Sequence, residues 1–186
     1  MRNLLSHTVL TPIMIFFLLL TTNTIAQSDF GAGINLGGGT IGGNLPTQGA
    51  FTSSFFIEAN PGFNANILTR LSFIYDTDTN ILLPKTTGRY YPFIKGFSLK
   101  GVTSQILSGN IYIEEGLGPL ILNDRTFDNI NEWDLGISFS VVVGFDLRTL
   151  ANSGFKLGAG TDYGLTFTNS NVRNFSVYFN LEYMIK

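Results

Sequence analysis

The most regular stretch of this sequence is WDLGISFSVVVGF, residues 133–145. Every second residue from Trp133 to Phe145 is apolar, and the residues between them are mostly glycine or serine, with Asp134 among them. A period of two is the pattern of a β-strand whose two faces differ. The stretch therefore predicts a strand with one bulky apolar face and one small or polar face.

The same alternation recurs along the chain after residue 26. It is cleanest near the C-terminus and weaker in the first half of the chain. The predicted strands are 29–37, 50–59, 63–75, 91–102, 110–122, 133–145, 155–167 and 175–185. Roughly eight strands of this length suit a membrane barrel, because a tilted membrane strand needs about nine to eleven residues.

The N-terminus has the three parts of a secretory signal peptide. Arg2 lies in a polar start, residues 13–20 form the apolar run IMIFFLLL, and Ala26 is a small residue that can precede a cleavage. The apolar run is too short to cross about 30 Å of hydrocarbon as a helix. We therefore predict a cleavable signal peptide over 1–26, followed by a single domain over 27–186.

The composition excludes several classes of function. The formal net charge is −2 and no basic cluster stands out, which argues against a nucleic-acid partner. There is no cysteine, and the single histidine, His7, falls inside the predicted signal peptide. Histidine-dependent catalysis and the commonest metal ligand are then missing from residues 27–186. We expect no cofactor, no metal site and no enzymatic activity, although a serine–lysine or carboxylate pair stays open.

Alternation alone does not decide which face points outward, because a soluble sandwich or lipocalin-like barrel turns its apolar face inward. The polar face of this chain is rich in glycine and serine, and the narrow interior of an eight-stranded barrel favours small side chains. Sparse charges of both signs on that face can pair inside such a barrel. The candidate interior residues are Arg70, Lys100, Glu114, Asp134, Lys156, Asp162 and Glu182.

The predicted connections alternate in length. Those at 37–49, 76–90 and 123–132 are long, and most of the others are shorter. Outer-membrane barrels have short periplasmic turns and longer outer loops. With residue 27 in the periplasm, the long connections are expected on the outside.

Two local motifs are interpreted as loop features. Asp76-x-Asp78-x-Asn80 has the opening spacing of a calcium-binding loop, but Ile81 stands where such a loop requires glycine. The glycine-rich segment 37–43 is followed by no lysine that could complete a phosphate-binding loop. Both segments are therefore expected to be exposed loops without a bound ion.

Taken together, the signal-like start, the eight alternating segments and the amphipathic last strand resemble the small outer-membrane β-barrel families. These include the OmpA transmembrane domain, OmpX-like proteins and the barrel-domain proteins common in Bacteroidetes-type bacteria. The resemblance covers 27–186 and is one of pattern, without a diagnostic motif. It implies an all-β, eight-stranded, antiparallel up-and-down transmembrane barrel in the outer membrane. The terminal Lys186 departs from the aromatic residue that usually ends the last strand of such barrels.

The leading hypothesis for function is a structural or surface-interaction protein of the outer membrane, because an eight-stranded barrel is normally filled by its own side chains and forms no general pore. Its expected partners are outer-membrane lipid, the barrel-assembly machinery during insertion, and an extracellular partner bound by the loops 37–49, 76–90 and 123–132. The alternatives are a soluble secreted barrel that binds a small apolar ligand and an outer-membrane enzyme that does not use histidine.

Overall fold

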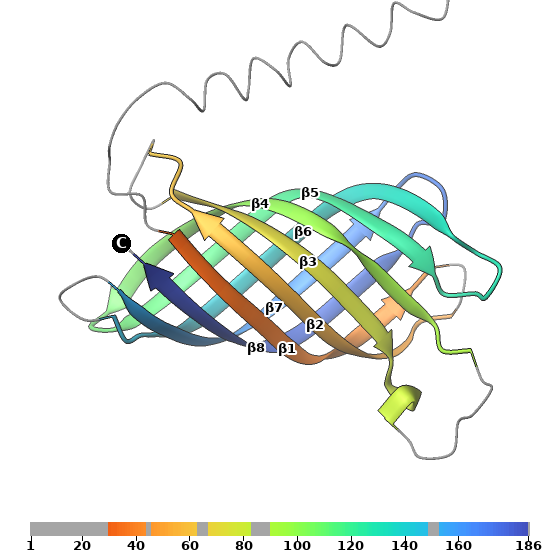
Figure 1. The fold of residues 1–186 in the computed structure, drawn as a ribbon, viewed down its shortest axis with the longest axis horizontal. Coiled ribbons are helices and arrows are strands. Elements are labelled where there is room, and N and C mark those ends of the chain that lie inside the picture. The colour runs from red at the N-terminus through yellow and green to blue at the C-terminus, as the bar shows by residue number, and fades with distance from the viewer. Residues whose placement is uncertain (1–29, 44–45, 63–66, 83–89, 149–152, 186) are drawn as a thin grey trace, which may run out of the picture.

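The computed structural model describes residues 30–43, 46–62, 67–82, 90–148 and 153–185, so the predicted signal peptide over 1–26 lies outside the described residues. Eight antiparallel strands follow one another around a closed barrel in chain order (Figure 1). They are β1 (Phe30–Gly42), β2 (Gln48–Ala59), β3 (Ile67–Asp78), β4 (Phe93–Ser108), β5 (Ile111–Arg125), β6 (Glu132–Asp146), β7 (Gly154–Thr166) and β8 (Arg173–Ile185). The prediction of an all-β, eight-stranded up-and-down barrel is confirmed.

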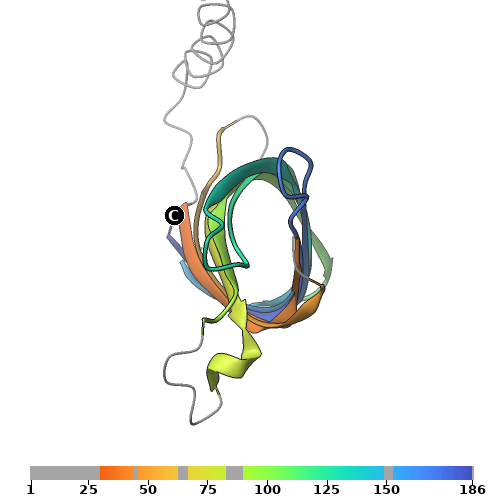
Figure 2. The same ribbon diagram turned by 90° about the vertical axis from the view of Figure 1, so that its right-hand side faces the viewer.

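Pairing of the first strand with the last closes the barrel. The β1–β8 ladder runs without interruption from the pair Phe30–Ile185 to the pair Gly42–Arg173. Seen along the barrel, the strands form a continuous ring (Figure 2). Every strand therefore has two hydrogen-bonded neighbours, and no row of backbone N–H and C=O groups is left at a free edge.

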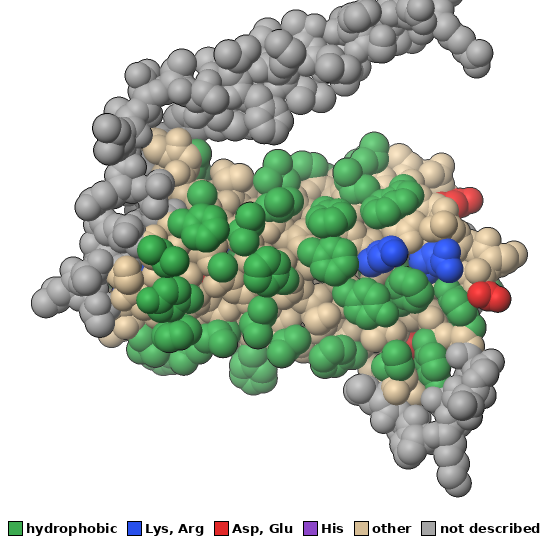
Figure 3. Space-filling model, in the orientation of Figure 1, with side chains coloured by type: hydrophobic (Ala, Val, Ile, Leu, Met, Phe, Trp, Pro, Cys, Tyr) green, Lys and Arg blue, Asp and Glu red, His purple; other side chains and the backbone are tan. Residues whose placement is uncertain are grey.

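The apolar side chains of the strands point outward. On β6, Ile137 is 51% exposed, whereas its neighbour Ser138 is fully buried in the interior. On β8, Phe179 is 79% exposed while Tyr178 and Asn180 face inward. Apolar side chains cover the middle of the visible wall, and the charged side chains on it gather toward one end (Figure 3). The barrel is thus apolar outside and polar inside, the reverse of a soluble barrel.

The two ends of the barrel differ. At one, which we call the terminal end, β1 begins, β8 ends, and the connections span 60–66, 109–110 and 147–153. At the other, the loop end, the connections span 43–47, 79–92, 126–131 and 167–172. Only 79–92 is long, and it contains η1 (Thr79–Leu82). No helix in the described part of the chain is long and apolar enough to cross a membrane.

The expectation of a long loop at 37–49 is wrong. The glycines of 37–43 mostly belong to β1, which continues to Gly42, so the connection is 43–47. The physical reason is close approach of β8: an added Cβ on Gly37 or Gly39 would lie 2.0 or 1.9 Å from a backbone oxygen of that strand. Glycines that indicate a turn in an ordinary sequence are required here inside a strand.

The other expected long loops are also shorter than predicted. β3 continues to Asp78 before η1 begins, and β5 and β6 leave only 126–131 between them instead of 123–132. On the other side, β4 continues through the expected connection 103–109 to Ser108, with a register shift between Ile106 and Ser108. Buried polar residues extend β3 and β5 beyond the point where the apolar alternation ends, whereas the extension of β4 is mostly exposed.

Gly39 and Gly38 offer a matched test of this packing. An added Cβ at Gly38 would have no neighbour nearer than 3.7 Å, whereas the one at Gly39 would overlap the carbonyl of Phe175. We expect Gly39→Ala to lower the free energy of unfolding by about 1–3 kcal/mol, the usual cost of overpacking. Gly38→Ala is expected to leave it nearly unchanged. Urea unfolding of both variants, refolded in detergent, measures the difference; equal effects would contradict the close approach of β8 to β1.

Candidate functional site in the barrel interior

The structure places the candidate interior residues inside the barrel. Each sits at an inward position of its strand. It is an even number of residues away from the small residues of that strand, so its side chain points to the same face as theirs. At most 3% of the surface is exposed in Arg70, Lys100, Glu114, Asp134, Lys156 and Glu182. Asp162 is half-buried. Polar groups so far from water need partners, and their partners divide the interior into three zones.

An ion cluster fills the interior near the terminal end. It consists of Glu58, Arg70, Glu114, Lys156 and Glu182, contributed by β2, β3, β5, β7 and β8. The guanidinium of Arg70 donates to Glu58 and Glu114, both at 2.7 Å, and Lys156 donates to Glu114 at 2.6 Å. Glu182 lies 3.7 and 3.9 Å from the two cations. Five strands are thereby tied together across the barrel axis.

Aromatic rings complete this cluster. The guanidinium of Arg70 lies 4.4 Å from the ring centroid of Phe56, and the ammonium of Lys156 lies 5.1 Å from that of Tyr112. Both rings are almost fully buried. A cation over an aromatic face gains more when water is excluded, so the rings help to compensate the cations for lost hydration.

The oxygens of Glu58, Glu114 and Glu182 come within 4.8 Å of one another, a spacing that could suit a metal ion. Arg70 and Lys156 already contact these carboxylates and supply the positive charge that a metal would bring. The cluster is therefore interpreted as an internal ion-pair network and not as a metal centre.

Glu58 was not among the candidate residues. Its strand contains the apolar run Phe55–Phe56–Ile57, which hides the alternation, so the sequence pattern does not show that Glu58 points inward. The available signal was its pairing: Glu58 faces Arg70 directly across the β2–β3 hairpin. Opposite charges in register across a hairpin stabilise it and could have indicated the contact.

The middle of the interior is a hydrogen-bonded polar layer. Lys100 forms an ion pair with Asp162, which also accepts a hydrogen bond from Ser138 at 2.8 Å. Asn180 donates to Asn35 at 2.8 Å, and Asn35 donates in turn to Ser54 at 2.9 Å, so a chain of bonds crosses from β8 over β1 to β2. These groups lie on the barrel axis between the ion cluster and the loop end, and most of their polar atoms have hydrogen-bond partners.

Apolar side chains and loop anchors occupy the loop end. Ile41, Ala50, Ile74, Ile94, Leu120, Leu122 and Val172 form a buried apolar cluster there. Asp134 differs from the other candidate residues, because it pairs with a loop instead of a cation. It accepts hydrogen bonds from Thr168 at 2.7 Å and from the hydroxyl of Ser170 at 2.6 Å, which fixes the connection 167–172 over the barrel mouth.

The segment expected to be a solvated loop at Asp76-x-Asp78-x-Asn80 is partly buried. Asp76 and Asp78 are 1% and 7% exposed at the end of β3, and Asn80 donates from its backbone N–H to Asp78 at 2.9 Å. That hydrogen bond joins the end of the strand to η1. The expectation of an exposed loop is wrong here because inward side chains continue the strand beyond its last bulky outward residue, Tyr75.

Comparison with known proteins agrees with this geometry. The sequence matches no family model and no curated protein. The structure is similar to Neisserial surface protein A, with a TM-score of 0.63 and 9% identity over 85% of this chain and 97% of that chain. It is similar to Ail, the attachment invasion locus protein of Yersinia pestis, with a TM-score of 0.55 and 10% identity over 85% of this chain and 99% of that chain. The chain has the fold of the small outer-membrane β-barrels. At these identities the likeness concerns the fold of this outer-membrane-type barrel alone. It does not extend to the side chains that fill the interior.

Arg70 is the most connected member of the ion cluster, and removing it tests how much the cluster contributes. Arg70→Met leaves buried carboxylates without their main counterion, which costs about 3–5 kcal/mol in comparable buried pairs. We expect a loss of that size in urea unfolding of the detergent-refolded protein. The exposed Arg173, changed to Met, is the matched control and should change stability by less than about 1 kcal/mol. Equal losses in the two variants would contradict a stabilising role for the cluster.

Proposed function

We propose that this protein is an integral outer-membrane barrel with a structural or surface-interaction role and without a general pore. The observation that carries the proposal is the combination of an apolar outer wall with a backbone ladder that has no free edge. In hydrocarbon every backbone polar group needs an internal partner, and a closed barrel is one of only two structures that provide this.

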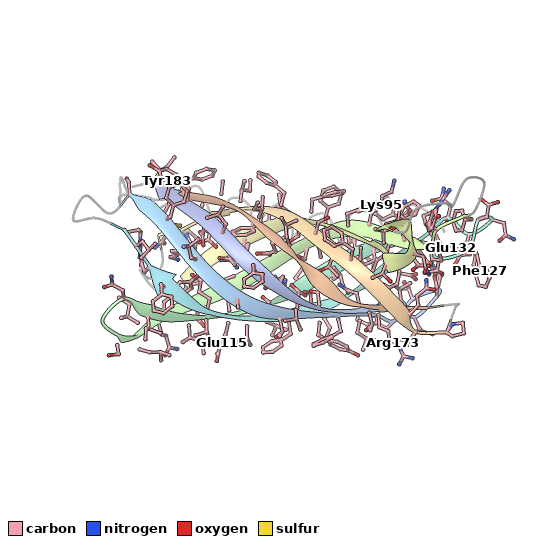
Figure 4. All side chains as sticks on the ribbon, turned by 90° about the horizontal axis from the view of Figure 1, so that it is seen from below. Lys95, Glu115, Phe127, Glu132, Arg173 and Tyr183 are labelled. Atoms are coloured by element: carbon pink, nitrogen blue, oxygen red, sulfur yellow. The ribbon has the colours of Figure 1, made fainter. Side chains whose placement is uncertain are left out.

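The distribution of aromatic and charged residues on the wall supports a membrane position. Trp133 is exposed near the loop end, and Tyr183 packs edge-on against Phe155 near the terminal end, with ring centroids 4.9 Å apart. Aromatic girdles at both interfaces are typical of membrane barrels. Lys95 and Arg173 lie on the wall toward the loop end, where a polar headgroup region would begin (Figure 4).

Glu115 is a charge on the outer wall that the proposal has to accommodate. It is exposed, on β5, and the pairing with Thr103 and Val141 on either side is regular. Figure 4 shows it pointing away from the barrel on the terminal half of the wall. An acidic side chain costs less toward the interface than at the midplane and less than Lys or Arg at equal depth. Membrane insertion therefore has to tolerate this one modest penalty.

The interior argues against a general pore and against the two alternatives. The ion cluster, the polar layer and the apolar cluster occupy the barrel axis in succession. A lipocalin-like carrier needs an apolar interior for its ligand, which the ion cluster does not offer. A serine–lysine enzyme would need access to its nucleophile, but Ser138 and Lys100 are at most 3% exposed.

The surface-interaction role is proposed for the loop end. The connection 79–92 is the longest between strands, and the exposed side chains of Ile81 and Phe127 give this end apolar contact points. Within the expected partner-binding regions, this supports 76–90 and 123–132, whereas 37–49 is mostly strand. Lipid around the wall, and the assembly machinery acting on β8 during insertion, are the other proposed partners.

Trp133 provides a direct test of membrane position, because it is the only tryptophan. In vesicles we expect its fluorescence to be quenched most strongly by lipids brominated near the headgroup. In the variant Trp133→Phe with Phe139→Trp, the reporter lies on the same outer face about 15 Å deeper, from six residues of a tilted strand. Quenching should then be strongest with lipids brominated near the ends of their acyl chains.

The control for the quenching experiment is the protein refolded in water without lipid. A soluble carrier would fold there and show no depth-dependent quenching when vesicles are added. Equal quenching of the two tryptophan positions at every bromine depth would contradict a transmembrane wall.

The filled interior predicts little ion conduction. In planar bilayers we expect far smaller single-channel currents than a water-filled porin gives, since the ion cluster, the polar layer and the apolar cluster obstruct the barrel axis. Stable porin-like conductance of the unmodified protein would contradict the absence of a general pore.

A further inference from the structure

A small cavity lies inside the barrel between the polar layer and the loop end. Its volume is about 20 Å³, enough for one water-sized guest. Its polar lining includes Asn35, Thr52, Ser54, Asp76, Asp162 and Asn174. All of these side chains carry oxygen, the ligand atom that hard cations prefer.

Asp76 places a carboxyl group in this cavity without a counterion. Its side chain is 1% exposed and accepts a hydrogen bond from Asn174 at 3.1 Å. Among the residues that the structure describes, no lysine or arginine lies within ion-pair distance of it. Asp162, by contrast, is neutralised by Lys100 and also bonded by Ser138. An ionised carboxylate buried without a counterion is costly, so Asp76 is either protonated or accompanied by a cation.

Two further oxygens are left without partners. Thr52 lies directly opposite Asp76 in the β2–β3 ladder, is 4% exposed, and its buried hydroxyl has no hydrogen-bond partner in the described structure. Oδ1 of Asn174 is likewise buried without a partner. A half-turn of that amide would direct its oxygen, in place of its NH₂ group, toward the carboxylate. The site therefore has a carboxyl group without a counterion, two oxygens without hydrogen-bond partners and room for a single guest.

We propose that this cavity binds one hard cation, of the size and chemistry of Na⁺ or Ca²⁺. Asp76 supplies the charged ligand, and Thr52 and Asn174 supply neutral oxygens. The acidic side chains Asp78 and Asp124, buried near the same end, favour cations over anions in this part of the barrel. Protonation of Asp76 is the competing explanation: it would remove the charge but leave the cavity without an ion. The proposal stands independently of the surface-interaction role.

The test is the cation dependence of folding. The full chain is refolded in detergent and unfolded in urea in tetramethylammonium chloride, with Na⁺ or Ca²⁺ added at constant ionic strength and Trp133 fluorescence as the readout. Above the dissociation constant, each tenfold rise in the free concentration of the cation that binds should raise the folding equilibrium constant about tenfold. The ion that produces this rise is thereby identified. The response should vanish in Asp76→Asn and persist in the control Asp128→Asn, whose side chain is exposed at the same end.

Thr52→Val provides a second variant that keeps the shape and the charge of the cavity. It should fold and require a higher cation concentration for half of the cation-dependent stabilisation. This variant therefore still tests the proposal if Asp76→Asn fails to fold. An unchanged response in Thr52→Val, a response retained by Asp76→Asn, or no response of the unmodified protein to either ion would each overturn the proposal. In the last case a stabilised Asp76→Asn would indicate a protonated carboxyl.

Discussion

Closure of the backbone ladder between β1 and β8 is the constraint on which the rest of this structure depends. With the ring closed, every strand is paired on both sides and the outer wall can be apolar without exposing an unpaired backbone group. The outer face is then free to carry Ile137, Phe139 and Phe179, and the interior has to accommodate the polar residues of the alternation. A single open edge in such a wall would place a row of unpaired N–H and C=O groups in an apolar surrounding.

Closure with only eight strands also determines what the interior contains. The space is narrow, so glycines such as Gly39 are needed where neighbouring backbones approach, and large polar side chains fit only if they share partners. The ion cluster meets this requirement by joining five strands through Arg70 and Lys156. Asp76 has no counterion of its own, so the pairing of interior charges is incomplete there. This gap is the basis for the proposed cation site.

Much of the fold could be predicted from the sequence because period-two alternation is a local property. The segments 133–145, 155–167 and 175–185 all match strands, and the parity of their residues identifies the inward side chains, among them Lys156 and Glu182. The prediction failed where two local signals compete. The glycines of β1 resemble a loop because glycine usually marks a turn, and only the proximity of β8 shows that they belong in a strand.

The detailed content of the interior could not be predicted in the same way. The contact between Arg70 and Glu114 joins strands 44 residues apart in the chain, and the cavity at Asp76 depends on Asn174, 98 residues away. Such contacts are set by register and closure, which alternation does not specify. The parity of a residue shows that it points inward, and the register decides which inward residues meet.

The central claim, apolar wall outside and polar filling inside, is tested most directly by paramagnetic relaxation of methyl groups in lipid nanodiscs. A nitroxide carried on the acyl chains should broaden the methyl signals of Leu135, Ile137 and Val143, which point outward, more strongly than those of Leu120, Leu122 and Val142, which point inward. A water-soluble paramagnetic chelate should broaden neither set. Broadening of the outward set by the chelate, or equal or stronger broadening of the inward set by the lipid nitroxide, would contradict the account.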